Sequence, residues 1–170
     1  MLTVTFSEGT IVDLENNVLS IIRSYEQQKL WSKEAGGVLI GKELKDTDHY
    51  IITAASTPTR HDKRSRFSFT RSMESAQPLI DRKWEESGGI ENYIGEWHTH
   101  PESKPTPSGI DQALIRQVVS DNSSPFPKVF LVIGGLNGSL YLGVAETLGS
   151  GDISISRQIE VDYEYIRNKG

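Results

Sequence analysis

The chain has 170 residues and a mass of 19.0 kDa, with 36% hydrophobic and 24% charged residues, a balance that excludes a disordered tail. This length predicts one domain, residues 1–170, large enough to bury a hydrophobic core. The net charge of −5 argues against a general nucleic-acid binder, and the absence of cysteine excludes disulfides, a thiolate nucleophile and a cysteine-rich zinc site.

The first residues of the chain show neither the basic start nor the long apolar stretch of a signal peptide. No apolar run approaches the roughly 18 residues that a membrane helix needs. These features predict a cytoplasmic protein without a membrane partner.

The first third of the chain is predicted to hold a strand, a helix and a hairpin. Alternating apolar residues predict a strand over residues 2–6, and a helical spacing predicts a helix over 13–28, with Asp13 as its start signal. The glycine-bounded apolar run 35–41 predicts a buried central strand, and residues 49–56 are its expected hairpin partner.

Residues 58–71 concentrate the positive charge of an otherwise acidic chain. Two phenylalanines, Phe67 and Phe69, are interleaved with the basic residues Arg60, His61, Lys63, Arg64, Arg66 and Arg71. This pattern fits either a solvated loop ending in a short edge strand or a docking face for an acidic partner or tail.

The remainder of the chain mixes helices and strands, which predicts an α/β domain. Helices are predicted over residues 72–86, where Pro78 fits least well, over 109–119, and over 163–169. Strands are predicted over residues 128–133, 140–147 and 153–161, with an Asn-Gly turn within 134–139.

The stretch 95–111 gathers the residues best suited to chemistry. His98 and His100 follow an apolar pair on a predicted strand, and the side-chain period of two puts both imidazoles on one face. A proline-rich turn then leads to Asp111, in the first turn of the helix over 109–119. Two imidazoles and one carboxylate suit a zinc ion that keeps its fourth position open for water.

Each part of this pattern also has a structural explanation. Ser108 and Asp111 have the spacing of a helix capping box. Capping accounts for neither His98 nor His100, and burying two imidazoles beside a carboxylate without a metal leaves polar groups unsatisfied. Glu34 precedes the central strand; its position alone allows a residue aimed into a site but favours a solvated loop residue.

In this order, these residues resemble the JAMM (JAB/MPN) metalloprotease family. The family pattern is a glutamate before a glycine-containing apolar strand, then His-x-His, ten residues and Asp, with a serine three residues before that Asp. Glu34, His98, His100, Ser108 and Asp111 fill every position. The resemblance implies a cytidine-deaminase-like α/β fold, with a central mixed sheet flanked by helices.

The resemblance also implies roles for these residues. His98, His100 and Asp111 would hold one zinc ion, Glu34 would be the general base that later protonates the leaving amine, and Ser108 would donate a hydrogen bond to the oxyanion. The implied reaction is hydrolysis of an amide or isopeptide bond after the C-terminus of ubiquitin, a ubiquitin-like protein or a sulfur-carrier protein.

Within the family, the compact length, the Gly-Glu-Trp-His-Thr-His-Pro sequence and the stretch 62–69 look like the stand-alone isopeptidases of bacterial anti-phage CBASS operons. That resemblance implies a protein substrate, the C-terminal tail of a cGAS-like nucleotidyltransferase (CD-NTase) joined to a lysine. It also implies a functional link to the E1–E2 fusion protein that makes this conjugate.

Other zinc enzymes fit the sequence less well. A nucleoside deaminase needs cysteine ligands and a zincin needs His-Glu-x-x-His, and both are absent; a dinuclear phosphoesterase needs further ligands. A non-catalytic MPN scaffold and a peptidase that trims a sulfur-carrier protein remain as alternatives, and the turn 102–107 is a candidate gate.

Overall fold

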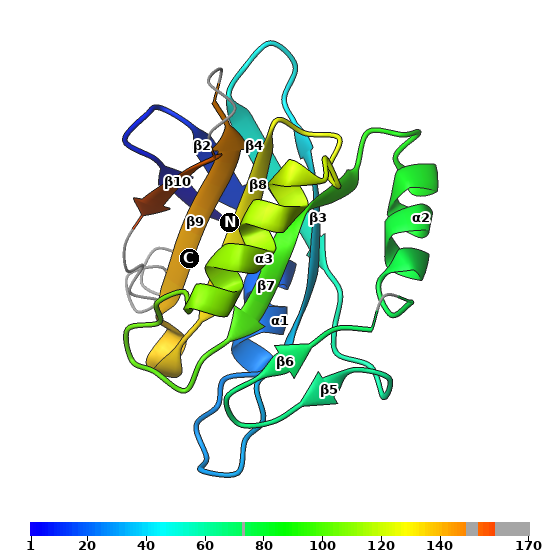
Figure 1. Ribbon diagram of the computed structural model, residues 1–170. Helices are drawn as coiled ribbons and strands as arrows, with labels where there is room; N and C mark the ends of the chain where they lie inside the picture. The colour runs from blue at the N-terminus through cyan, green and yellow to red at the C-terminus, as the bar shows by residue number, and fades with distance from the viewer. Residues whose placement is uncertain (73, 149–152, 159–170) are drawn as a thin grey trace.

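The computed structural model describes residues 1–72 and 74–148, and the backbone of residues 153–158 (Figure 1). Within these residues, eight strands form one mixed sheet in the order β1-β2-β4-β3-β7-β8-β9-β10. Its strands are β1 (Leu2–Thr5), β2 (Ile11–Leu14), β3 (Gly36–Glu43), β4 (His49–Ala55), β7 (Asn92–Thr99), β8 (Lys128–Gly134), β9 (Leu140–Thr147) and β10 (Ile153–Gln158). The predicted α/β fold with a central mixed sheet is confirmed.

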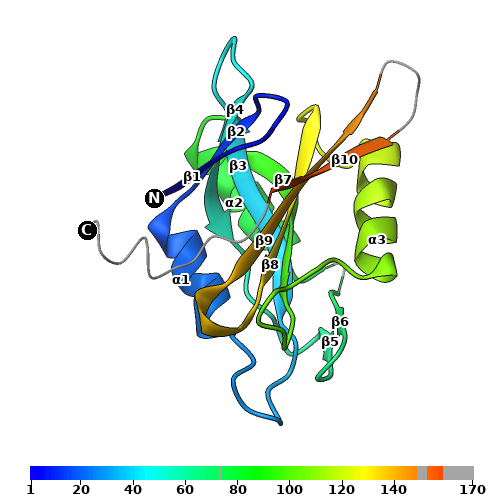
Figure 2. The same cartoon turned by 90° about the vertical axis from the view of Figure 1, so that its left-hand side faces the viewer.

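Helices cover both faces of the sheet, and a small hairpin lies at one end. The helices are α1 (Asn16–Ser24), α2 (Gln77–Glu86), α3 (Gly109–Ser120) and the short 3-10 turn η1 (Leu136–Gly138). The hairpin pairs β5 (Lys63–Arg64) with β6 (Phe69–Thr70). Figure 2 shows α1 and α3 on opposite sides of the sheet.

The central strand β3 is buried on both faces, as its continuous apolar sequence predicts. Leu39 packs into the core beneath α1, whereas Val38 and Ile40 pack into the core beneath α3. The predicted hairpin of β3 with β4 is confirmed by their antiparallel pairing. A second antiparallel pairing, of β3 with β7, brings the start of β3 beside the end of β7.

The helix α3 connects two parallel neighbours, β7 and β8. Parallel strands cannot be joined by a tight turn, so the chain leaves the end of β7 and returns along α3 to the start of β8. The first turn of α3 therefore begins close to the end of β7.

The predicted helix over residues 13–28 is too long, because its first residues belong to the strand β2. Asp13 lies in β2, buried, where it accepts a hydrogen bond from Thr3 Oγ1 and lies 2.8 Å from His49 Nε2. The helix α1 begins only at Asn16. Short strands such as β2 are stabilised by partners distant in sequence, here β4, and leave little periodicity to read.

The next helix also begins later than predicted, at Gln77 instead of residue 72. Pro78 thus lies in the first turn of α2, where its missing N–H costs no hydrogen bond. The Asn-Gly turn is confirmed, with positive φ at Asn137 (58°) and Gly138 (75°). The predicted helix 163–169 and the end of the last strand, 159–161, lie outside the described residues.

None of the helices in the described ranges is long and apolar enough to cross a membrane.

Candidate metal centre

The two histidines at the end of β7 lie side by side on one face of the sheet. The ring centroids of His98 and His100 are 4.9 Å apart, and both side chains are buried. Trp97 alternates to the opposite face, in the core with α1, as the side-chain period of a strand requires. The pair therefore faces α3.

Asp111 reaches both imidazoles from the first turn of α3. Its Oδ1 lies 3.2 Å from His98 Nε2, and its Oδ2 lies 3.5 Å from His100 Nε2. Burial disfavours the charged form, but contacts with the two imidazoles and a hydrogen bond from Ser108 hold the pKa of Asp111 well below its usual range. Asp111 is therefore a carboxylate at neutral pH.

The predicted capping box is present at the same place. Ser108 Oγ accepts a hydrogen bond from Asp111 N–H at 3.2 Å, and the Asp111 carboxylate accepts one from Ser108 N–H at 2.6 Å. The box fixes the side chain of Asp111, so that capping and contact with the imidazoles are compatible. Accepting a bond leaves the Ser108 hydroxyl proton available for donation.

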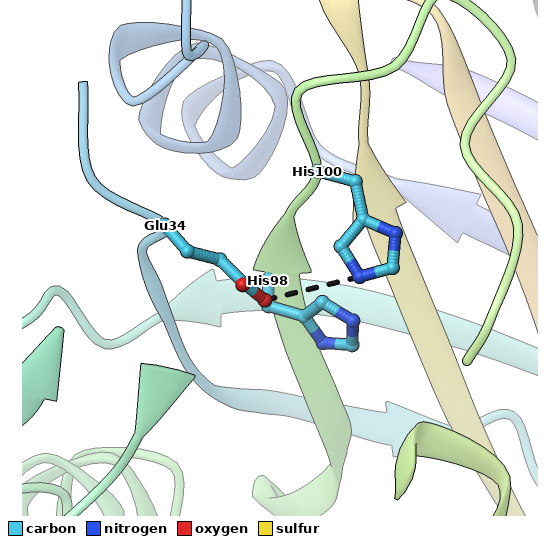
Figure 3. Close-up of side chains that lie close together, drawn as sticks. All are labelled: Glu34, His98 and His100. Atoms are coloured by element: carbon cyan, nitrogen blue, oxygen red, sulfur yellow. Dashed lines mark ion pairs between the residues drawn. The ribbon is translucent and has the colours of Figure 1, made fainter. Parts of the chain in front are cut away.

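Glu34 enters the site from the loop before β3. In the antiparallel pairing of β3 with β7, Gly36 lies opposite His98, and continuing this register places Glu34 across from His100. Glu34 Oε1 lies 3.8 Å from His100 Nε2, and the side chain points toward both imidazoles (Figure 3). Glu34 is only 5% exposed, so the solvated-loop interpretation is wrong.

Burial has a marked effect on the acidity of Glu34. Desolvation raises its pKa to about 7, because the loss of water penalises the carboxylate more than the attraction of His100 stabilises it. A carboxyl group with this pKa can both accept and release a proton near neutral pH. The same environment also raises the pKa of His100, whose own desolvation is outweighed by Asp111, Glu34 and Glu102.

The residues present fit a divalent metal ion. His98 Nε2 is buried and makes no hydrogen bond of good geometry, although Asp111 Oδ1 lies 3.2 Å away, so this nitrogen is left unsatisfied by the protein alone. Ligand atoms of Glu34, His98 and His100 all lie within 4.8 Å of one another, and Asp111 borders both imidazoles. Imidazole nitrogens and carboxylate oxygens are the donors that zinc uses where cysteine is absent.

Comparison with known proteins identifies the family. A family model described as prokaryotic homologs of the JAB domain matches residues 16–144 of the chain.

The chain belongs to the prokaryotic JAB family.

Several relatives of this JAB domain carry names that describe an activity. A CD-NTase/cGAS isopeptidase of Pseudomonas aeruginosa is 31% identical over 144 residues, which cover 85% of this chain and 89% of the relative. A CD-NTase/cGAS isopeptidase of Escherichia coli is 35% identical over 130 residues, 73% of this chain and 80% of the relative. A probable metalloprotease y4qB of Sinorhizobium fredii is 33% identical over 105 residues, 60% of this chain and 63% of the relative.

The family and these relatives establish that the JAB domain described here is a hydrolase of the JAMM peptidase type, a class that depends on a metal ion. The predicted resemblance to the JAMM family is confirmed.

The basic segment 58–71 contains a short hairpin that its sequence did not indicate. In this hairpin β5 pairs with β6, and Arg64, Arg66 and Arg71 donate hydrogen bonds to groups outside the segment. Arg71 Nη2 donates to the buried carboxylate of Glu96 at 3.0 Å, which opposes the rise that burial imposes on the pKa of Glu96. Arg64 donates to the main-chain carbonyls of Lys33 and Glu34. Arg66 donates to those of Lys29 and Leu30, so both arginines have a structural role.

Two polar residues close to the site were not predicted from the sequence. Thr99, between the two histidines, points to the opposite face of β7 and donates to Gln27 Oε1 at 3.2 Å. Strand alternation could have indicated that Thr99 turns away from the metal side. Gln27 stands in a polar connector, where nothing local distinguishes a buried glutamine from a solvated one.

Proposed function

We propose that this protein is a zinc-dependent isopeptidase that hydrolyses the amide bond after the C-terminus of a conjugated CD-NTase or ubiquitin-like protein. The proposal is carried by one observation, the convergence of His98, His100, Asp111 and Glu34 from three separate segments in a buried site. We further propose that residues 1–170 act as one catalytic domain, since a single sheet runs from β1 to β10.

In this proposal, His98, His100 and Asp111 hold the zinc ion. When bound there, zinc supplies a Lewis acid for the scissile carbonyl and lowers the pKa of a coordinated water toward ~7. Glu34, which is buried beside His100, takes the proton of the attacking water on its carboxylate and delivers it to the leaving nitrogen. Ser108 donates a hydrogen bond from its hydroxyl group to the oxyanion that forms on the carbonyl oxygen.

The names of the relatives support the substrate class. Four relatives are named CD-NTase/cGAS isopeptidases, so we infer that this chain acts in the cytoplasm on a CD-NTase joined through its C-terminus to an amine. An E1–E2 fusion protein that forms the conjugate is the functional partner in this proposal. The alternative substrate is a ubiquitin-like sulfur-carrier protein that needs its C-terminus trimmed.

Mass spectrometry of a candidate conjugate, before and after incubation with the protein, tests the proposal. We expect release of the CD-NTase with an intact C-terminus, loss of cleavage on chelation, and recovery with added zinc. Cleavage that persists in a chelator excess would contradict the metal requirement. Cleavage of an extended sulfur-carrier protein in preference to the conjugate would favour the alternative substrate.

Replacement of Ser108 separates its two roles. Ser108→Ala removes both the helix cap and the oxyanion donor, so we expect a loss of about 1 kcal/mol of stability and of about a hundredfold in kcat. Ser108→Gly is the matched variant, because glycine at an N-cap costs only a few tenths of a kcal/mol. Equal losses of kcat in both variants, with unequal thermal shifts, are expected; an unchanged kcat in Ser108→Gly would remove Ser108 from the mechanism.

A further inference from the structure

The β5–β6 hairpin binds the peptide of Glu34 on both sides. The Glu34 N–H donates to the Ser65 carbonyl at 2.7 Å, and the Glu34 carbonyl accepts from Arg64 Nε at 2.8 Å. Arg64 Nη2 also donates to the Lys33 carbonyl at 3.3 Å. A guanidinium presents several donors in a rigid fork, so one side chain can hold two successive carbonyls. A segment 30 residues later in the sequence thus fixes the backbone from which the Glu34 side chain starts.

Gln27 ties the same loop to the histidine strand. This side chain is 1% exposed, and its amide donates to the Ser32 carbonyl at 3.2 Å and to the Arg66 carbonyl at 2.8 Å. Its Oε1 accepts from Thr99 Oγ1, which in turn accepts from the Ala35 N–H at 3.0 Å. Burying an amide is costly unless it is hydrogen-bonded, and Gln27 is bonded through both its nitrogen and its oxygen. One buried amide therefore connects the Glu34 loop, the hairpin and β7.

The hairpin also packs tightly against the start of β3. A Cβ at Gly36 would lie 2.6 Å from Phe69 Cδ1 and 2.6 Å from the Trp97 carbonyl oxygen. Glycine at this position, two residues after Glu34, leaves room for both the Phe69 ring of β6 and the Trp97 carbonyl of β7. Figure 1 shows the hairpin and the connection after α1 at the same end of the sheet.

The carboxylate of Glu34 depends on this support. Its distance of 3.8 Å from His100 Nε2 is too long for a hydrogen bond, so that contact cannot fix the side chain. A misplacement of about 1 Å in a catalytic group can cost a hundredfold in rate. The hydrogen bonds to the Glu34 peptide therefore fix the point from which the side chain extends toward His100.

We propose that the β5–β6 hairpin and Gln27 form a clamp that positions Glu34 for proton transfer, with Arg64 and Gln27 as positioning residues. This inference rests on the proposed role of Glu34 as general base. It assigns Arg64 of the basic segment to the positioning of Glu34, in place of charge-based docking of the substrate.

Kinetics of Arg64→Ala test the clamp. With the conjugate as substrate, we expect kcat to fall by about tenfold or more while KM and zinc affinity stay unchanged. Arg64→Lys keeps the charge but loses the fork, so it should retain most of the defect. Lys63→Ala, an exposed neighbour on β5, is the matched control and should leave kcat unchanged. A rise in KM in both Arg64→Ala and Lys63→Ala, with kcat preserved, would instead indicate docking and overturn the clamp.

A double-mutant cycle separates positioning from general structural damage. In a Glu34→Gln background, Arg64→Ala should lower the residual rate less than twofold, because its effect passes through Glu34. A full multiplicative loss would contradict the proposal. If Glu34→Gln itself retained wild-type turnover, the proposed function would fail first, and the two failures are thereby distinguished.

Hydrogen exchange tests the clamp without any substrate. The amides of Glu34 and Ala35 are bonded to the Ser65 carbonyl and to Thr99 Oγ1. We expect Arg64→Ala to accelerate exchange of the Glu34 amide, and Thr99→Val to accelerate that of the Ala35 amide, each at least about tenfold with β8 protection unchanged. Wild-type protection of both amides in these variants would overturn the clamp, whatever the substrate is.

Discussion

Replacement of Glu34 by glutamine is expected to lower kcat by about a thousandfold while the protein keeps its metal. Glutamine has the same shape but cannot take up a proton, and general acid–base catalysis contributes typically 10²–10⁴-fold. The Glu34 carboxyl group is buried beside the imidazoles, where it is placed to accept and release one proton per turnover. Turnover of the conjugate and zinc content by elemental analysis measure the two quantities.

The matched control for this variant is Glu102→Gln. Glu102 Oε2 lies 3.9 Å from His100 Nδ1, so both glutamates neighbour the same imidazole, but Glu102 is exposed. We expect a loss of less than about threefold there. A thousandfold loss in both variants would mean that negative charge near His100, and not proton transfer by Glu34, supports the reaction.

Asp111→Asn is expected to weaken zinc affinity by at least about a hundredfold and to abolish turnover at limiting zinc. The substitution removes the negative charge that both imidazoles face, and substitutions merely supporting metal ligands already cost 10–100-fold in affinity. The asparagine oxygen can still accept the hydrogen bond from Ser108 N–H, so the helix cap survives. Zinc titration against a competing chelator measures the affinity.

Asp121→Asn makes the same change at the other end of α3. Asp121 is the C-cap residue of that helix and is exposed, so zinc affinity should stay at the wild-type value. Wild-type zinc affinity in Asp111→Asn would show that Asp111 only caps the helix, and the metal would then need another ligand set that includes Glu34.

Local sequence predicted the elements whose signals are contained within a few residues. The continuous apolar run of β3 and the alternation that puts His98 and His100 on one face both follow from the pleat of a strand. The spacing of Ser108 and Asp111 predicted the start of α3 because a capping box lies within one turn. These features depend on interactions between residues a few positions apart, and the sequence pattern that predicts them spans the same short distance.

Other features were misread because their partners are distant in sequence. Asp13 looked like a helix start, yet its strand is stabilised by parallel pairing with β4. The sequence of the basic segment 58–71 did not indicate its contact with the Glu34 loop, since nothing local shows that Arg64 reaches the carbonyl of Glu34.

The sequence by itself determined which side chains are available for chemistry: two histidines one residue apart, an aspartate in the next helix turn, a serine before it and a glutamate ahead of a buried strand. Only the tertiary structure decided that Glu34 faces His100, because that depends on the register of β3 against β7, two strands separated by β4, the hairpin and α2. The sequence specifies the types of side chain. The raised pKa of the buried Glu34 and its place beside His100 arise from contacts between segments that folding brings together.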